Sequence, residues 1–241
     1  PILAAYVNNS LRELNMRIFK PMTVRYIDIT HFEGYRVYQR TITFILQKAM
    51  YDLYGNRKFH VRHSLGRGLY CEFADSEPTA EELKALRERM QQIIDARYTI
   101  TRRRMLTAEI NDIYERYGLD DKIELLNTRP RLYSDMYTLD NTVGYFYGAL
   151  TPDTGYIHLF DVRPYYKGFH IALPTRLDPS QLDLKVHWNK MSDVFHEYHQ
   201  WVDIMGVPAA IAKLVEEEDC KRIGYEAEHL LCASMEAWKE K

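Results

Sequence analysis

The residues of this 241-residue chain that could do metal chemistry are two pairs of histidines. His196 and His199 stand in the sequence HEYH, which is one residue short of the HExxH pattern that places two zinc ligands on one helix face. His60 and His63 have the same separation, but on a strand an odd spacing points two side chains to opposite faces. We therefore expect ordinary histidines at both places and no metal ligands in the chain.

A run of three arginines, Arg102, Arg103 and Arg104, is the second candidate for chemistry, because arginines can contact phosphate groups. The alternative, which we favour, is a solvated strand edge whose charges discourage pairing with another strand. Lys and Arg number 32 against 34 Asp and Glu, so the net charge of −2 gives no general attraction to nucleic acid or membrane. The net charge leaves open a local basic patch on the surface.

Motifs of common enzyme classes are absent from the sequence. It has no GxxxxGK[ST] loop for ATP and no GxSxG elbow for a nucleophilic serine. Cys71, Cys220 and Cys232 lie far apart without CxxC spacing, which fits a reducing cytoplasm and no disulfide framework. No apolar run approaches the ~20 residues that span a bilayer. We therefore predict no catalytic or cofactor-binding residues, no membrane partner and a cytoplasmic location.

A helix over residues 40–55 is the clearest element that could position functional side chains. Its apolar residues recur every three or four positions, which gives one buried face: Ile42, Ile45, Leu46, Ala49, Met50 and Leu53. Gly55 can adopt the left-handed conformation that ends a helix. Arg40 and Phe44 share another face, one turn apart, where a metal site would need two ligands.

The remaining elements predict an α+β fold. Thr79 and Glu82 form a capping box that begins a helix through about residue 96. Runs rich in β-branched and aromatic residues predict strands over 2–7, 18–24, 26–29, 59–62 and 68–73. The aromatic-rich stretch 133–169 predicts antiparallel strands packed on a helix layer, although some rings could stack on a nucleobase. Beyond Pro174, a linker precedes helices predicted over 190–205, 209–218 and 224–238.

Four stretches of this sequence resemble a known family. The run from Arg40 to Phe73, then TAEELKALRERM and VGYFYGALTPDTG, resembles the editing-type second domain of threonyl-tRNA synthetases, which alanyl-tRNA synthetases share in part. AYVNNSLRELNMRIF resembles the last part of the TGS, or β-grasp, domain that precedes it. The resemblance implies a partial TGS-like segment at residues 1–36, an editing-like domain at 37–176 and a helical segment at 177–241. A small N-terminal sheet that belongs to the main domain is the alternative for residues 1–36.

In that family the helix carries HxxxH and a later loop carries CxxxH, and together they support hydrolysis of a mischarged aminoacyl ester. The corresponding positions here are Arg40 and Phe44, then Phe146 and Leu150. None of these four can bind zinc in the family's way, so the resemblance implies a scaffold without its hydrolytic site. With Tyr145 and Tyr147 added, these residues form our candidate ligand pocket.

The sequence SLGRGLYCEF and the later FHEYHQWVDIMGV resemble the N-terminal half of bacterial uridine (nucleoside) kinase fusion proteins. This implies a non-catalytic accessory or regulatory region with a kinase domain in cis, and ATP and Mg²⁺ only in that missing domain. The start at Pro1 without Met suggests a fragment. Two alternatives stay open, namely a free-standing synthetase-related RNA-binding or editing-like module and, least favoured, a metal hydrolase built on HEYH. Nucleoside, nucleotide or tRNA as ligand stays open, as does a homo-oligomer.

Overall fold

The helix predicted over residues 40–55 begins eight residues earlier than its apolar pattern indicates. In the computed structural model, which describes residues 1–128, 131–182, 184, 193–194, 197–198 and 201, helix α1 spans Phe32–Tyr54. His31 caps its first turn, because its Nδ1 accepts a hydrogen bond from the Glu33 N–H at 3.2 Å. Gly55 follows the last turn with φ of 61°, as predicted.

The first residues of the chain form a three-stranded antiparallel sheet with strand order β2-β1-β3. Its strands are β1 (Ile2–Val7), β2 (Ser10–Arg12) and β3 (Val24–Asp28). The prediction of β1 is confirmed. The strand predicted over 18–24 is wrong, because only Val24 belongs to a strand. Pro21 has no N–H to donate to a strand ladder, which disfavours pairing in this segment.

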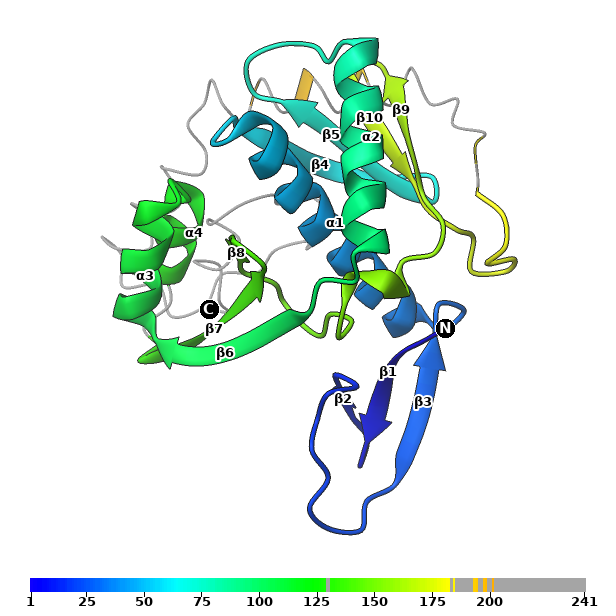
Figure 1. Ribbon diagram of the computed structural model, residues 1–241, viewed down its shortest axis with the longest axis vertical. Helices are drawn as coiled ribbons and strands as arrows, with labels where there is room; N and C mark the ends of the chain where they lie inside the picture. Colours follow the sequence, from blue (N-terminus) through cyan, green and yellow to red (C-terminus); the bar gives the residue numbers. More distant parts are fainter. Residues whose placement is uncertain (129–130, 183, 185–192, 195–196, 199–200, 202–241) are drawn as a thin grey trace. The chain divides into compact units, whose positions relative to one another are not determined.

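A four-stranded antiparallel sheet with order β4-β5-β10-β9 forms the centre of the fold. Its strands are β4 (Phe59–Leu65), β5 (Gly68–Phe73), β9 (Asp161–Tyr165) and β10 (Gly168–Ala172). Helix α2 (Ala80–Asp95) packs against α1 and β9, so that a helix layer covers this sheet (Figure 1). The predicted α+β class, with antiparallel strands packed on helices, is confirmed.

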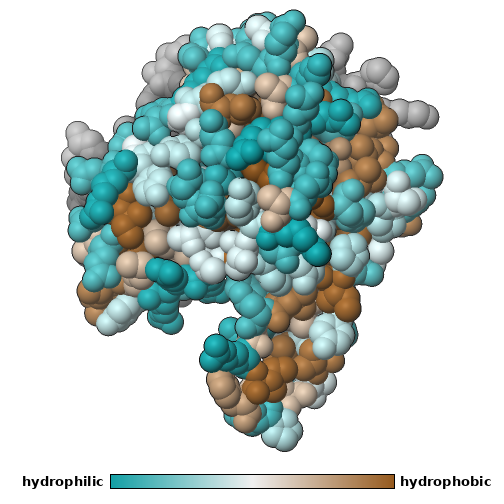
Figure 2. All heavy atoms as spheres, in the orientation of Figure 1, coloured by the Kyte–Doolittle hydropathy of each residue, from teal (hydrophilic) through white to brown (hydrophobic). Residues whose placement is uncertain are grey.

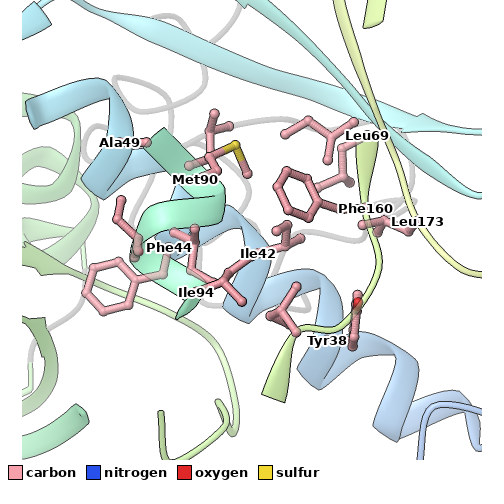
Figure 3. Packing of buried hydrophobic residues seen from close by; sticks show 14 of the residues in the cluster. Tyr38, Ile42, Phe44, Ala49, Leu69, Met90, Ile94, Phe160 and Leu173 are labelled. Atoms are coloured by element: carbon pink, nitrogen blue, oxygen red, sulfur yellow. The ribbon is translucent and has the colours of Figure 1, made fainter. Parts of the chain in front are cut away.

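The core lies between these two helices and the sheet. Side chains from α1, α2 and the strands meet in one cluster, in which Ile42, Met90 and Leu69 lie close together (Figure 3). The buried Tyr38 joins α1 to the segment before β9 through its hydroxyl group. That group donates to the Leu159 carbonyl at 2.7 Å and accepts the N–H groups of His158 and Leu159 at 3.2 and 3.0 Å. The hydroxyl group of this buried tyrosine therefore donates one hydrogen bond and accepts two, which is its full capacity.

The capping box at the start of α2 is confirmed. The Glu82 N–H donates to the Thr79 hydroxyl at 3.2 Å, and the Thr79 N–H donates to the Glu82 carboxylate at 2.8 Å. Glu82 also accepts a hydrogen bond from Arg57 at 2.6 Å. The Arg57 and Thr79 hydrogen bonds hold the pKa of Glu82 below its ordinary value. The Glu82 carboxylate thus caps the first turn of α2 and also binds Arg57 in the segment before β4.

The expectation that His60 and His63 point to opposite faces is wrong. A β-bulge between Val61 and His63 shifts the register, so that His60 lies opposite Glu72 and His63 lies opposite Tyr70. Glu72 and Tyr70 are two residues apart on β5 and share a face, since the Tyr70 hydroxyl donates to the Glu72 carboxylate at 2.6 Å. The extra residue of the bulge therefore brings both histidines to one face.

A third sheet, with order β6-β7-β8, consists of β6 (Ile100–Leu106), β7 (Tyr133–Leu139) and β8 (Thr142–Gly144). The arginine run lies on β6, an edge strand of this sheet, as we preferred. Two helices, α3 (Thr107–Arg116) and α4 (Asp120–Asn127), pack against each other, and a short 3-10 helix, η1, spans Thr154–Tyr156. Gly118 has φ of 65° just after α3, a left-handed conformation that commonly follows the end of a helix.

The chain divides into two compact units, residues 1–103 with 136–186, and residues 104–135 with 187–241. The first holds the small N-terminal sheet, α1, α2 and the central sheet, and the second holds α3 and α4. The boundary predicted between residues 36 and 37 falls inside α1, and the three domain bounds stay predictions. The helices predicted over 209–218 and 224–238, and most of 190–205, lie outside the described residues.

Apolar atoms gather on the surface of the β1–β3 sheet, at the bottom of the view in Figure 2. Among the exposed apolar residues of this part of the chain, Tyr26 lies on β3, and Ile18 and Phe19, the latter 85% exposed, lie between β2 and β3. Among the helices of the described residues, none combines the length and the apolar character needed to cross a lipid bilayer. Cys71 is fully buried on β5, and burial raises the pKa of its thiol, which makes it unreactive.

Candidate functional site

Helix α1 presents the first two residues of the predicted pocket. Arg40 and Phe44 are four positions apart and therefore lie on one face of the helix. Phe44 is completely buried, whereas Arg40 is half-buried. The face changes from apolar to charged within one turn, so that only its Arg40 end can meet a polar ligand.

The loop that follows β8, residues 145–150, supplies the other four predicted residues. Strand β8 pairs with β7, with Gly144 opposite Tyr137, and this pairing directs the loop toward α1. A Cβ at Gly144 would lie 3.0 Å from the Phe146 ring and 3.1 Å from the Phe44 ring, so a larger residue would push them apart. Gly148 has φ of 112°, which L side chains rarely adopt. Two glycines thus let the loop approach the helix closely.

The predicted residues separate into a packed group and an outward pair. The rings of Phe44 and Phe146 pack with centroids 5.0 Å apart, and Leu150 is buried in the same core. The Nη1 of Arg40 donates to the Ala149 carbonyl at 3.4 Å. Tyr145 and Tyr147 contact each other edge to face at 5.3 Å, and Tyr147 is 49% exposed.

Three residues outside the predicted pocket lie beside the packed group. The Tyr137 hydroxyl donates to the Glu13 carboxylate at 2.5 Å and lies 2.9 Å from the Gly148 carbonyl oxygen. The Tyr137 ring packs against Phe146, with centroids 6.0 Å apart. Arg102 Nη1 lies 3.9 Å from Glu13, and its guanidinium lies 5.9 Å from the Tyr137 ring centre. The sequence had indicated Arg102 in the arginine run and Tyr137 in the aromatic-rich stretch, but it gave no signal for Glu13, which lies 124 positions before Tyr137.

The charged groups of this cluster are Arg40, Arg102 and Glu13. Burial lowers the pKa of Arg40, opposed by the charge of Glu33. An arginine stays protonated at neutral pH even so, because its ordinary pKa is far higher. The described residues contain no group of three His, Cys, Asp or Glu side chains that could hold a metal ion. His196 and His199 of the HEYH sequence lie outside the described residues.

Comparison with known proteins finds threonine–tRNA ligases among the relatives of this chain. Threonine–tRNA ligase of Symbiobacterium thermophilum is 28% identical over 160 residues, which is 66% of this chain and 25% of the relative. The ligases of Francisella tularensis strain SCHU S4 and of Azobacteroides pseudotrichonymphae are 23% and 24% identical, over 66% and 69% of this chain. This chain contains a threonyl-tRNA synthetase-like region. No family model matches the chain.

The synthetase-like region is a part of what those relatives contain. The chain spans about a quarter of the length of the threonine–tRNA ligases that it matches. These relatives support the predicted synthetase resemblance, and they give no support to the nucleoside kinase resemblance. Within this region, the four positions at which the resemblance places metal ligands carry a guanidinium, two phenyl rings and an isobutyl group. Arg40 is the one polar side chain among these four.

Proposed function

We propose that this chain is a tRNA-synthetase-related module that binds the 3′-terminal part of an RNA and does not hydrolyse an aminoacyl ester. The observation that carries the proposal is the contact between Phe44 and Phe146, where the resemblance puts metal ligands. Helix α1 and the loop after β8 still come together there, but through apolar packing. RNA is the proposed partner because the matched relatives are, by name, ligases of tRNA.

The chemistry of the packed group supports binding rather than hydrolysis. Hydrolysis at such a site needs a bound metal or a base to position and activate water. Phe44, Phe146 and Leu150 offer neither, and the nearby hydroxyl groups of Thr41 and Thr151 are buried and occupied. The Thr41 hydroxyl accepts the Thr151 N–H at 3.2 Å and donates to the Val37 carbonyl at 2.9 Å.

The finer assignment of the chain follows from this function and stays part of the proposal. Residues 37–176 form an editing-type domain that has lost its chemistry, and residues 1–36 form a partial TGS-like segment. The basic edge of β6 supplies additional contacts to the RNA backbone. An RNA partner of this kind fits the cytoplasmic location expected from the sequence.

The first test measures RNA binding and ester hydrolysis with the same preparation. We expect transfer RNA to bind in the micromolar range by fluorescence anisotropy, with an affinity that falls as salt is raised, because phosphate contacts release counterions. We expect seryl-tRNA to hydrolyse at the rate seen without protein. Absent or salt-insensitive binding contradicts the RNA assignment. Hydrolysis above the protein-free rate that disappears in an Arg40 variant contradicts the loss of chemistry.

A second candidate function is the accessory region of a nucleoside kinase. The observation that favours it is the SLGRGLYCEF sequence, which forms the end of β4, the following turn and β5 here and resembles kinase fusion proteins. ATP and Mg²⁺ would then belong to a kinase domain outside these 241 residues. Sequencing the parent reading frame past Lys241 decides between the candidates. A GxxxxGK[ST] loop downstream supports the kinase, and an early stop codon removes it.

A further inference from the structure

Arg40 is a half-buried cation whose hydrogen-bonding capacity is mostly unused. A guanidinium group has five N–H donors. Among the residues that the structure describes, Arg40 makes one hydrogen bond, the long one of 3.4 Å to the Ala149 carbonyl. Most of its donors are therefore left for water or a ligand.

The carboxylates of the neighbourhood are engaged elsewhere. Glu33, whose charge acts on Arg40, makes its ion pair with Arg36 at 3.6 Å. Glu13 accepts the Tyr137 hydroxyl and lies near Arg102. No carboxylate of the described residues lies within ion-pair distance of Arg40. Partial burial of an unpaired charge is unfavourable, and an anionic ligand would compensate it.

Arg40 is only half-buried, and a glycine of the loop lies directly beside its guanidinium. Gly148 is exposed, and a Cβ at this position would lie 2.8 Å from the Arg40 Cζ atom, so a larger side chain would cover or displace the group. The half-exposed ring of Tyr147 belongs to the same loop, one residue before Gly148. A second cation, Arg102, belongs to the cluster around Tyr137, whose hydroxyl lies 2.9 Å from the Gly148 carbonyl oxygen.

We propose that Arg40 is the anchor for a phosphate group of a nucleotide, whose base stacks on Tyr147. The planar guanidinium can bind two phosphate oxygens at once, and an exposed aromatic ring accepts any nucleobase. The inference rests on the proposed function and specifies which atoms meet the RNA. The phosphate belongs either to the terminal nucleotide of an RNA or to a free nucleoside monophosphate. The two sources are separated by the experiment.

The test compares four proteins by calorimetric titration: the wild type, Arg40→Met, Arg40→Lys and the control Arg67→Met. Arg67 is exposed in the β4–β5 turn, so Arg67→Met removes the same charge outside the proposed site. The probes are uridine, UMP and a short single-stranded oligoribonucleotide, and thermal unfolding of each variant confirms that it is folded. If Arg40→Met does not fold, Arg40→Lys keeps the charge and loses the paired geometry.

We expect the wild type to bind UMP or the oligonucleotide at least about tenfold more tightly than uridine. Arg40→Met should lose this preference, Arg40→Lys should keep a part of it, and Arg67→Met should keep all of it. The tighter of the two phosphate probes identifies the source. Equal binding by wild type and Arg40→Met, or no preference for phosphate in the wild type, overturns the inference. If transfer RNA binds wild type and Arg40→Met equally, the proposed function stands and this inference alone fails.

Discussion

Replacing Lys48 by methionine is expected to lower the free energy of unfolding by about 3 kcal/mol. The ammonium group is buried on α1 and uses all three of its N–H donors. Its Nζ lies 2.8 Å from Asp52, 2.7 Å from the Asn141 side-chain oxygen and 3.0 Å from Asp140. In the variant, Asp52 still has Arg89 as an ion-pair partner at 2.8 Å. We therefore expect a loss of stability at the lower end of the range for a broken buried ion pair. Urea unfolding at neutral pH measures the change.

The matched control for this prediction is Lys84→Met, since Lys84 is 78% exposed and its Nζ lies 4.0 Å from Glu88. We expect it to change stability by less than about 0.5 kcal/mol. The difference between Lys48→Met and wild type should narrow in acid. The hydrogen bond from Lys48 is the main cause that lowers the pKa of Asp140 from its ordinary value of 3.8. The stabilisation that this pair gives the folded protein is therefore fully present above pH 3.8 and is lost as the pH falls through the lowered pKa. Equal stability of Lys48→Met and wild type would show that the ion pairs contribute nothing.

Phe44→Ala is expected to lower the free energy of unfolding by about 3–5 kcal/mol. The Phe44 ring is fully buried between α1 and the loop after β8, and its removal leaves a cavity against Phe146. Phe146→Ala should have a smaller effect because that ring is half-buried. The double variant should lose less than the sum of the two, since the second truncation enlarges a cavity that already exists. Urea unfolding of the wild type, the two single variants and the double variant measures the interaction energy between the two rings.

Phe19→Ala is the control for the aromatic truncation, because this ring is 85% exposed. We expect a change of less than about 0.5 kcal/mol in the free energy of unfolding. If Phe44→Ala were equally harmless, the rings would not form a rigid part of the core. The site would then be loose enough for a ligand to enter between α1 and the loop, and the proposed loss of chemistry would lose its structural support.

Local patterns predicted the elements that depend on nearby residues. The face of α1, the capping box of Thr79 and Glu82, and the stop at Gly55 each follow from spacing within one helix. The start of α1 was missed because Gly34 lies in its first turn, and the cap comes from His31, which is an unusual capping residue. A β-bulge has no reliable sequence signal, so the shared face of the two histidines on β4 could not be foreseen.

The candidate site was predicted only in part, for a different reason. Resemblance aligned α1 with the loop after β8, and it thereby located Arg40, Phe44 and Phe146 in one region. The contact between Glu13 and Tyr137 joins positions that are far apart in the chain, and no periodicity connects them. The exposure of Tyr147 and the positive φ of Gly148 depend on the conformation of this loop, which a single sequence does not specify.

The packed rings of Phe44 and Phe146 also bear on evolutionary history. If an ancestor carried ligands at these positions, a return to them by single steps now passes through less stable intermediates. A histidine in place of Phe44 would bury an imidazole without a metal or a hydrogen-bond partner and would leave unfilled space beside Phe146. Each further ligand would meet the same penalty until all were present. If the proposed loss of chemistry is right, the packing of these two rings would therefore oppose a stepwise return of metal ligands.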